Sequence, residues 1–113
     1  MLQTELDIIS QLDIMIYVIH TFANSTAEDI FNGDNTRAAR LLPRSLWDVA
    51  VRKLDQLNAA VDLTDLKVPP GNRLKALSGA LVGFHSIRIN DQYRIVFKWV
   101  KGEVFAVKIE DYH

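Results

Sequence analysis

The sequence predicts an α+β domain in which a mainly antiparallel β-sheet carries two helices packed on one face. Helical periodicity is confined to residues 24–60, whereas residues 73–112 are short runs of alternating apolar and polar side chains separated by turn residues. The links between the last three runs are short, and short links join antiparallel neighbours. The chain has 113 residues, which is enough for one domain with one core.

A strand and a short helix are predicted first. Residues 15–22 are rich in aromatic and β-branched residues, which is typical of a strand. Ser25 followed by Glu28 predicts a capping box at a helix start, and Gly33 predicts its end. Residues 1–14 are expected to be an N-terminal extension, either an amphipathic helix or the product of a start codon placed before Met15. The predicted single domain therefore spans residues 15–113.

A longer helix is predicted after Pro43, over residues 44–60. Its apolar residues recur at helical spacing and form one stripe facing a core, comprising Leu46, Ala50, Leu54 and Leu57. A loop at residues 69–72 ends the helical half of the chain. The strands that follow are predicted at residues 73–79, 83–89, 93–100 and 103–112, with turns at 90–92 and 101–102.

Composition excludes several classes of protein. The chain has no cysteine, which excludes a disulfide scaffold, a thiolate zinc site and a cysteine nucleophile. No apolar run approaches the roughly 18 residues of a membrane span. The first residues carry Glu5 and Asp7 without Lys or Arg, so they do not resemble a secretory signal. We therefore expect a cytoplasmic protein with no membrane partner.

Charge is divided unevenly along the chain, although the formal net charge is only −1. Residues 1–71 hold 6 Lys and Arg against 10 Asp and Glu, whereas residues 72–113 hold 7 against 4. Such an asymmetry indicates either a localised anion-binding surface or chance. The placement of the basic residues has to decide between the two.

The last three strands each have one strongly apolar face, because successive side chains alternate between the faces of a sheet. These apolar faces are expected to lie on the same side, against the helices. They are predicted to carry Ile87 and Ile89 from one strand, Tyr93, Ile95, Phe97 and Trp99 from the next, and Phe105, Val107 and Ile109 from the last.

The opposite side of the sheet, here called the open face, is predicted to be basic. It gathers Arg88, Arg94, Lys98 and Lys108, beside small residues that leave room for a ligand. Cations on one face repel each other, and folding alone gives no reason to collect them without acids. The alternative is a solvated face whose cations pair with acids from loops or helices. An anion-binding or nucleic-acid surface is the favoured interpretation.

The last strand delivers Asp111, Tyr112 and His113 to the edge of the open face. Histidine can exchange a proton near neutral pH, and tyrosine can stack on a base. Arginine binds phosphate through a bidentate fork. This set suits attack of a 2′-OH on its own phosphodiester. The other histidines and the tryptophans are interpreted as structural: His20, His85, Trp47 and Trp99.

Residues 73–113 closely resemble the C-terminal half of HigB-type toxins, also called plasmid maintenance system killer proteins, of the RelE/ParE toxin superfamily. The residues that carry the resemblance are Leu74, Leu77, Gly79, Ser86, Ile87, Arg88, Asn90, Gln92, Arg94, Ile95, Phe97, Asp111, Tyr112 and His113. It implies a small RelE-like domain. Two positions depart from the family pattern: Ser78 replaces a usual Lys, and Asn90 stands where some relatives have Arg, so each removes one phosphate contact.

The resemblance also implies a function, namely the toxin of a type II toxin–antitoxin system. Such toxins are ribosome-dependent endoribonucleases, or mRNA interferases, that need no metal or other cofactor. A helix-turn-helix, HigA-like antitoxin from the same operon holds them inactive. By matching position, the implied cleavage residues are Arg94, Asp111, Tyr112, His113 and Lys75, and the expected RNA-binding residues are Arg73, Arg88, Asn90, Lys98 and Lys108.

In the expected mechanism, Asp111 or His113 takes the proton from the 2′-OH, while Arg94, aided by Arg88, stabilises the charged phosphorane. Tyr112 orients or stacks on the nucleotide, and the product is a 2′,3′-cyclic phosphate. Two alternatives stay open: a non-enzymatic, ParE-like inhibitor of DNA gyrase, and an inactive toxin that only binds its antitoxin. The Asp-Tyr-His ending favours RNA cleavage.

Overall fold

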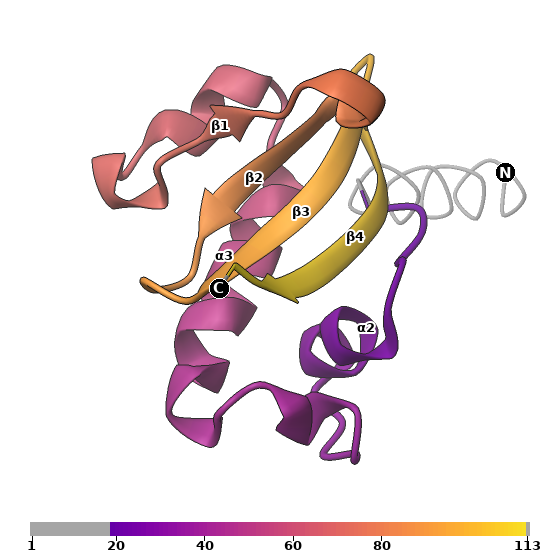
Figure 1. Cartoon of the computed structure of the whole chain (residues 1–113), viewed down its shortest axis with the longest axis vertical. Helices are drawn as coiled ribbons and strands as arrows, with labels where there is room; N and C mark the ends of the chain where they lie inside the picture. The colour runs from indigo at the N-terminus through magenta and orange to yellow at the C-terminus, as the bar shows by residue number, and fades with distance from the viewer. Residues whose placement is uncertain (1–18, 113) are drawn as a thin grey trace, which may run out of the picture.

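The structure is a computed structural model that describes residues 19–112. Within them, two helices cover one side of a four-stranded sheet whose strands follow in the order β1-β2-β3-β4, each antiparallel to its neighbour (Figure 1). The elements are α2 (Ser25–Asn32), α3 (Trp47–Ala59), β1 (Lys75–Ala76), β2 (Phe84–Arg88), β3 (Tyr93–Val100) and β4 (Glu103–Asp111). Short 3₁₀ turns lie at Ala39–Leu41, Arg44–Leu46, Leu63–Lys67, Pro70–Asn72 and Gly79–Leu81. The predicted fold class is confirmed.

The core lies between the helices and one face of the sheet. Helix α3 crosses behind β2 and β3, and α2 lies beside β4 (Figure 1). Three of the four residues of the predicted stripe, Ala50, Leu54 and Leu57, are fully buried on α3, whereas Leu46 lies in the 3₁₀ turn before the helix and is partly buried. They pack with Ile30 of α2 and with residues of all three long strands: Ile87, Ile95, Phe97, Val104 and Val107.

Helix α2 begins one residue earlier than the predicted capping box. Asn24, not Ser25, caps the helix, because its Oδ1 accepts a hydrogen bond of 3.0 Å from the backbone N–H of Ala27. The Nδ2 of the same side chain donates to the carbonyl of Ile109 at 2.9 Å. The cap therefore also ties the helix to β4. The predicted stop at Gly33 is confirmed by its left-handed conformation, with φ of 78°.

A β-bulge interrupts the pairing of β3 with β4. Val96 pairs with Lys108 and Lys98 pairs with Phe105, so one residue of β3 faces two residues of β4. Ala106, one of those two, has a φ of +54°. A bulge of this kind reverses which face the following side chains occupy.

The bulge corrects one predicted face. Phe105 was expected in the core, but it lies opposite Lys98 on the open face, and Val104 is the fully buried residue instead. Strict alternation counts Phe105 with Val107, and the extra residue at Ala106 breaks that count. Beyond the bulge, Val107 and Ile109 are buried as predicted.

The turn at residues 101–102 links β3 and β4 as predicted. Lys101 and Gly102 have φ of 50° and 81°, the two positive values of a type I′ hairpin turn. The predicted strand at 73–79 is shorter than expected, since only Lys75 and Ala76 pair with β2.

The predicted strand at 15–22 is described only in part. Ile19 and Phe22 form isolated parallel bridges with Val104 and Val107, so this segment runs along the free edge of β4. Residues 15–18 and the predicted extension 1–14 lie outside the described residues. No helix within 19–112 is long and apolar enough to cross a membrane.

Candidate active site

The open face is organised in rows that run across the strands, because paired residues of neighbouring strands share a face. Arg94 lies directly opposite Arg88 on one side and Glu110 on the other. The remaining rows are Lys75–Ser86–Val96–Lys108 and Phe84–Lys98–Phe105. The predicted cationic residues of the sheet therefore do lie on one face.

Arg94 is the most firmly held of these cations. Its Nε donates to Ser86 Oγ at 2.8 Å, and its Nη2 donates to the carbonyls of Arg73 at 2.7 Å and Ser86 at 3.3 Å. All these acceptors are neutral, and no carboxylate within residues 19–112 forms an ion pair with Arg94. The guanidinium is thus oriented while its charge stays uncompensated.

The surroundings of Arg94 disfavour its charge. Burial lowers the pKa of its guanidinium, and the neighbouring cations Arg88 and Arg73 lower it further, while Tyr112 opposes them. Arginine nevertheless stays protonated in proteins. A partly buried permanent cation with two further arginines near it is a candidate anion-binding site.

The loop that supplies the Arg73 carbonyl is held in place by the buried side chain of Asn72. Arg73 has a φ of 47°, a left-handed conformation that is unusual for a non-glycine residue. The preceding Asn72 is fully buried. Its Nδ2 donates to Gln56 Oε1 at 3.0 Å and to the carbonyl of Leu66 at 3.1 Å, and its Oδ1 accepts from Lys53 Nζ. The loop is therefore anchored to α3.

Tyr112 approaches Arg94 from the end of β4. The Arg94 Cζ lies 5.5 Å from the centroid of the Tyr112 ring, within the range of a cation–π contact. The backbone N–H of Tyr112 donates to the carbonyl of Gln92 at 2.6 Å, which extends the β3–β4 pairing by one residue. The ring is nonetheless 43% exposed, so a nucleotide can reach it.

Asp111 lies on the other side of the sheet. It pairs with Tyr93, whose ring packs against the core, and it follows the buried Ile109 by two residues. Its Oδ2 accepts from Gln92 Nε2 at 3.0 Å. It borders a cavity of about 210 Å³ on the helix side, lined by Asn24, Thr26, Leu41, Leu42, Tyr93, Ile109 and Asp111. The expectation that Asp111 joins the basic face is therefore wrong for its placement.

The cations of the open face fall into two groups. Arg88 pairs with Asp91 of the adjacent turn, and Lys108 Nζ lies 3.2 Å from Glu110 Oε1. For Arg88 and Lys108 the structure thus agrees with the alternative interpretation, in which the cations pair with nearby acids. Arg73, Lys75 and Lys98 have no ion pair within the described part of the chain.

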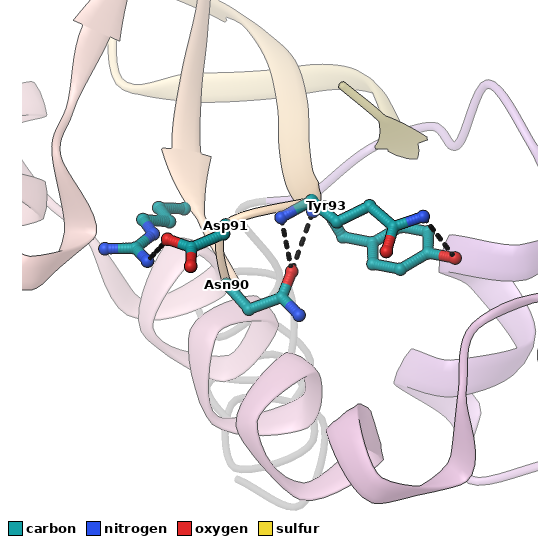
Figure 2. A network of polar contacts seen from close by, with 5 residues as sticks. Asn90, Asp91 and Tyr93 are labelled. Atoms are coloured by element: carbon teal, nitrogen blue, oxygen red, sulfur yellow. Dashed lines mark hydrogen bonds and ion pairs between the residues drawn. The ribbon is translucent and has the colours of Figure 1, made fainter. Parts of the chain in front are cut away.

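Asn90 closes the turn between β2 and β3 (Figure 2). Its Oδ1 accepts from the backbone N–H groups of Gln92 at 2.9 Å and Tyr93 at 2.8 Å, while Asp91 reaches back to Arg88. This geometry accounts for Asn90 through the turn itself. Its expected contact with RNA stays a prediction.

Ser86 and Asn72 are the residues that sequence reasoning missed as supports of Arg94. Alternation placed Ser86 on the open face, but its contact with Arg94 depends on strand register. Asn72 was predicted only as part of a turn.

The expected cleavage residue Lys75 pairs with Ser86 across β1 and β2, so its exposed side chain shares the row next to Arg94. His113 lies outside the described residues.

The remaining histidines of the described chain differ in their surroundings. His85 stacks on Phe97 with ring centroids 6.1 Å apart, and its buried Nδ1 has no hydrogen-bond partner. Burial lowers its pKa, and the backbone carbonyl of Gly83 opposes the shift. His20 is exposed and lies 3.4 Å from Glu103. Within residues 19–112, no group of three His, Asp or Glu side chains could hold a metal ion.

A four-stranded antiparallel sheet backed by two helices is the fold of the RelE-like toxins. The chain is similar to the YoeB dimer from Staphylococcus aureus, with a TM-score of 0.52 and 17% identity, over 87% of this chain and 98% of that one. The YoeB–YefM complex from the same organism gives a TM-score of 0.50 at 17% identity, over 84% and 97% of the two chains.

The sequence comparisons narrow this class to one family. The model of the RelE-like toxin HigB of type II toxin–antitoxin systems matches residues 20–113. Toxin HigB-1 from Vibrio cholerae serotype O1 is 43% identical over 81 residues, which are 72% of this chain and 83% of that relative. The chain therefore belongs to the HigB family of RelE-like toxins of type II toxin–antitoxin systems.

Proposed function

We propose that the chain is a ribosome-dependent endoribonuclease that cuts mRNA by attack of a 2′-OH on the adjacent phosphodiester. The observation that carries this proposal is Arg94, a partly buried cation that is oriented by Ser86 and the Arg73 carbonyl and forms no ion pair within residues 19–112. The Nε and Nη2 groups are used by these bonds, and within residues 19–112 Nη1 donates none, so Nη1 can donate to a phosphate oxygen that the positive charge attracts. Membership of the HigB family supports RNA as the source of that phosphate.

In the proposed step, the O2′ atom bonds to phosphorus and the bond from phosphorus to O5′ breaks. The products are a 2′,3′-cyclic phosphate and a 5′-hydroxyl end, and no metal takes part. Negative charge grows on the non-bridging oxygens as the phosphorane forms. Arg94, with Lys75 in the next row of the open face and Arg73 in the adjoining loop, stabilises that charge more strongly in the transition state than in the bound substrate.

Two protons must move, one from the 2′-OH and one to the departing O5′ atom. We assign the first to His113, whose imidazole exchanges protons near neutral pH, and the second, which protonates O5′, to the exposed ammonium of Lys75 in the row next to Arg94. Asp111 is the weaker candidate because its strand position directs it toward the helix side of the sheet. Tyr112, beside the Arg94 guanidinium, orients the nucleotide.

The proposed partners follow from the same function. The toxin acts in the cytoplasm, where it meets the ribosome and its mRNA. A helix-turn-helix, HigA-like antitoxin from the same operon holds it inactive. A solved relative, YoeB, is described in complex with YefM, which supports a protein partner for this chain as well. Copurification of the chain with the product of the neighbouring reading frame tests the pairing.

The test is cleavage of a defined mRNA on programmed ribosomes by the purified chain. We expect cut products with 2′,3′-cyclic phosphate and 5′-hydroxyl ends. Replacing the nucleotide before the cut by its 2′-deoxy form should abolish that cut, because the nucleophile is gone. Intact mRNA, together with gyrase-dependent DNA breaks on induction, would contradict the proposal and support a ParE-like inhibitor. Intact mRNA with tight antitoxin binding would indicate an inactive toxin.

A further inference from the structure

A second set of side chains on the open face is not used by the cleavage chemistry. Phe84, Lys98 and Phe105 lie in one row across β2, β3 and β4, since Lys98 pairs with both phenylalanines. His20 continues the row, because its ring stacks on Phe105 with centroids 4.9 Å apart and planes 15° apart. These four residues are called the aromatic row.

The aromatic row does not serve the core. The core lies on the opposite face, and neither Phe84 nor Phe105 belongs to it. Both rings are only half-buried, and His20 is exposed. The bulge at Ala106 is what turns Phe105 outward and puts Val104 inward. If burial of apolar surface alone decided the arrangement, the larger Phe105 would lie in the core in place of Val104.

The row also carries charge suited to a polyanion. Lys98 Nζ lies 6.0 Å from the centroid of the Phe84 ring, and Lys98 has no ion pair within residues 19–112. Glu103 lies 3.4 Å from His20 Nε2, so this acid is paired with the histidine at the end of the row. Aromatic rings interleaved with a free cation are the arrangement that binds single-stranded nucleic acid.

The row lies at a useful distance from the cleavage site. Arg94 and Lys98 are four residues apart on β3, which is about 13 Å at about 3.3 Å per residue. Both point to the open face, and Val96 between them is flanked by Ser86 and Lys108. A single RNA strand can therefore run from Arg94 to the aromatic row along one surface.

We propose that the aromatic row is a base-stacking subsite, in which Phe84 and Phe105 hold an unpaired mRNA base a few nucleotides away from the phosphate at Arg94. The proposal rests on the RNA substrate of the proposed function. Lys98 contacts the backbone of that nucleotide, and His20 supports the Phe105 ring from outside. The subsite binds the substrate and takes no part in the bond-breaking step.

The test combines protein and substrate changes. Phe84→Leu and Phe105→Leu remove the flat ring and keep an apolar side chain, and Phe31→Leu on α2 is the matched control. In single-turnover cleavage on programmed ribosomes, we expect the half-saturating toxin concentration to rise about 5- to 150-fold for each row variant. The rate at saturation should stay unchanged, and Phe31→Leu should match the wild type once folded.

An abasic scan of the mRNA supplies an outcome that folding defects cannot mimic. One abasic position near the cut should weaken the wild type by a similar factor and leave Phe105→Leu unaffected. Binding of a short fluorescent RNA is measured in parallel. Phenylalanine-dependent RNA binding without cutting would support the subsite and overturn the proposed function. Two results would overturn the subsite. One is cleavage that no abasic position weakens, and the other is row variants that lose only antitoxin binding.

Discussion

The guanidinium of Arg94 lies over the ring of Tyr112, with 5.5 Å between Cζ and the ring centroid. This contact joins the beginning of β3 to the end of the described chain on the open face. It brings together two residues, Arg94 and Tyr112, that the resemblance implied for the same site. The contact, together with the hydrogen bond from the Tyr112 N–H to the carbonyl of Gln92, holds Tyr112 against the sheet.

Arg94→Ala should lower single-turnover cleavage by about 10²–10³-fold, because it removes a donor aimed at developing charge. The free energy of unfolding should change by less than about 1 kcal/mol, since the variant also relieves repulsion from Arg88 and Arg73. Cleavage assays and urea unfolding measure the two quantities. Ile95→Ala, one position along, is the contrasting variant.

Ile95 is fully buried, so its truncation should cost about 2–5 kcal/mol of stability and leave the rate per folded molecule nearly unchanged. If both variants lost activity only in proportion to unfolding, the assignment of the two faces would be wrong. Arg94→Lys should also fail, because a lysine keeps the charge and lacks the fork that Ser86 and the Arg73 carbonyl orient.

Ser86→Ala should leave a folded protein that cuts about tenfold more slowly at saturating substrate, because Arg94 Nε loses its acceptor and the guanidinium is less well oriented. Substrate affinity should change less than the rate, since the charge is still present. Ser45→Ala, at an exposed position, is the control. An unchanged rate for Ser86→Ala would show that Arg94 is positioned without this bond.

Asn72→Ala should lower the free energy of unfolding by about 1–3 kcal/mol, because Lys53 and the carbonyl of Leu66 lose a buried partner. Cleavage should fall as well at temperatures where the variant is folded, since the loop that supplies the Arg73 carbonyl is loosened. Thermal unfolding and cleavage at low temperature separate the two effects. The exposed Asn32→Ala should change neither by much.

Side-chain alternation was sufficient to predict the open face where the strands are regular. Arg88, Arg94 and Lys98 lie on β2 and β3, whose pairing is regular over its whole length. Alternation failed at Phe105, because Ala106 adopts a positive φ that nothing in the local sequence indicates. A bulge is defined by the pairing of two strands, so it cannot be predicted from the sequence of one strand alone.

The placement of Asp111 followed from alternation, since it shares parity with the buried Ile109. The prediction that Asp111, Tyr112 and His113 all lie at the edge of the open face did not follow this alternation. The supports of Arg94 could not be predicted in the same way. The contact with Ser86 requires the β2–β3 register, and the contact with the Arg73 carbonyl requires the loop conformation that Asn72 fixes.

Stability should fall as the pH drops below about 6.5, the ordinary pKa of histidine, because burial lowers the pKa of His85 in the folded state. The unfolded chain then binds a proton that the folded chain resists, so the loss grows until the folded pKa is passed. His85→Leu should remove this part of the pH dependence in urea unfolding, and His20→Gln should retain it. If the free energy of unfolding depended on pH equally in His85→Leu and the wild type, the role of His85 would be contradicted.

The last prediction separates the two acid–base candidates at the end of β4. Asp111→Asn keeps an oxygen that can accept from Gln92 Nε2 and removes only the charge. Because Asp111 lies on the helix side of the sheet, cleavage should stay within a few-fold of the wild type. His113→Ala should lower the rate at saturation by about 10²–10⁴-fold, as expected for loss of a general base. RNA binding should persist in both variants, because the arginines of the open face are unchanged.

The measurement is single-turnover cleavage from pH 5 to 9, with RNA binding measured in parallel. The ascending limb of the pH profile should be retained in Asp111→Asn and disappear in His113→Ala. A cutting rate abolished by Asp111→Asn, with folding and RNA binding intact, would show that the carboxylate reaches the 2′-OH around the edge of β4 and that His113 is not the base.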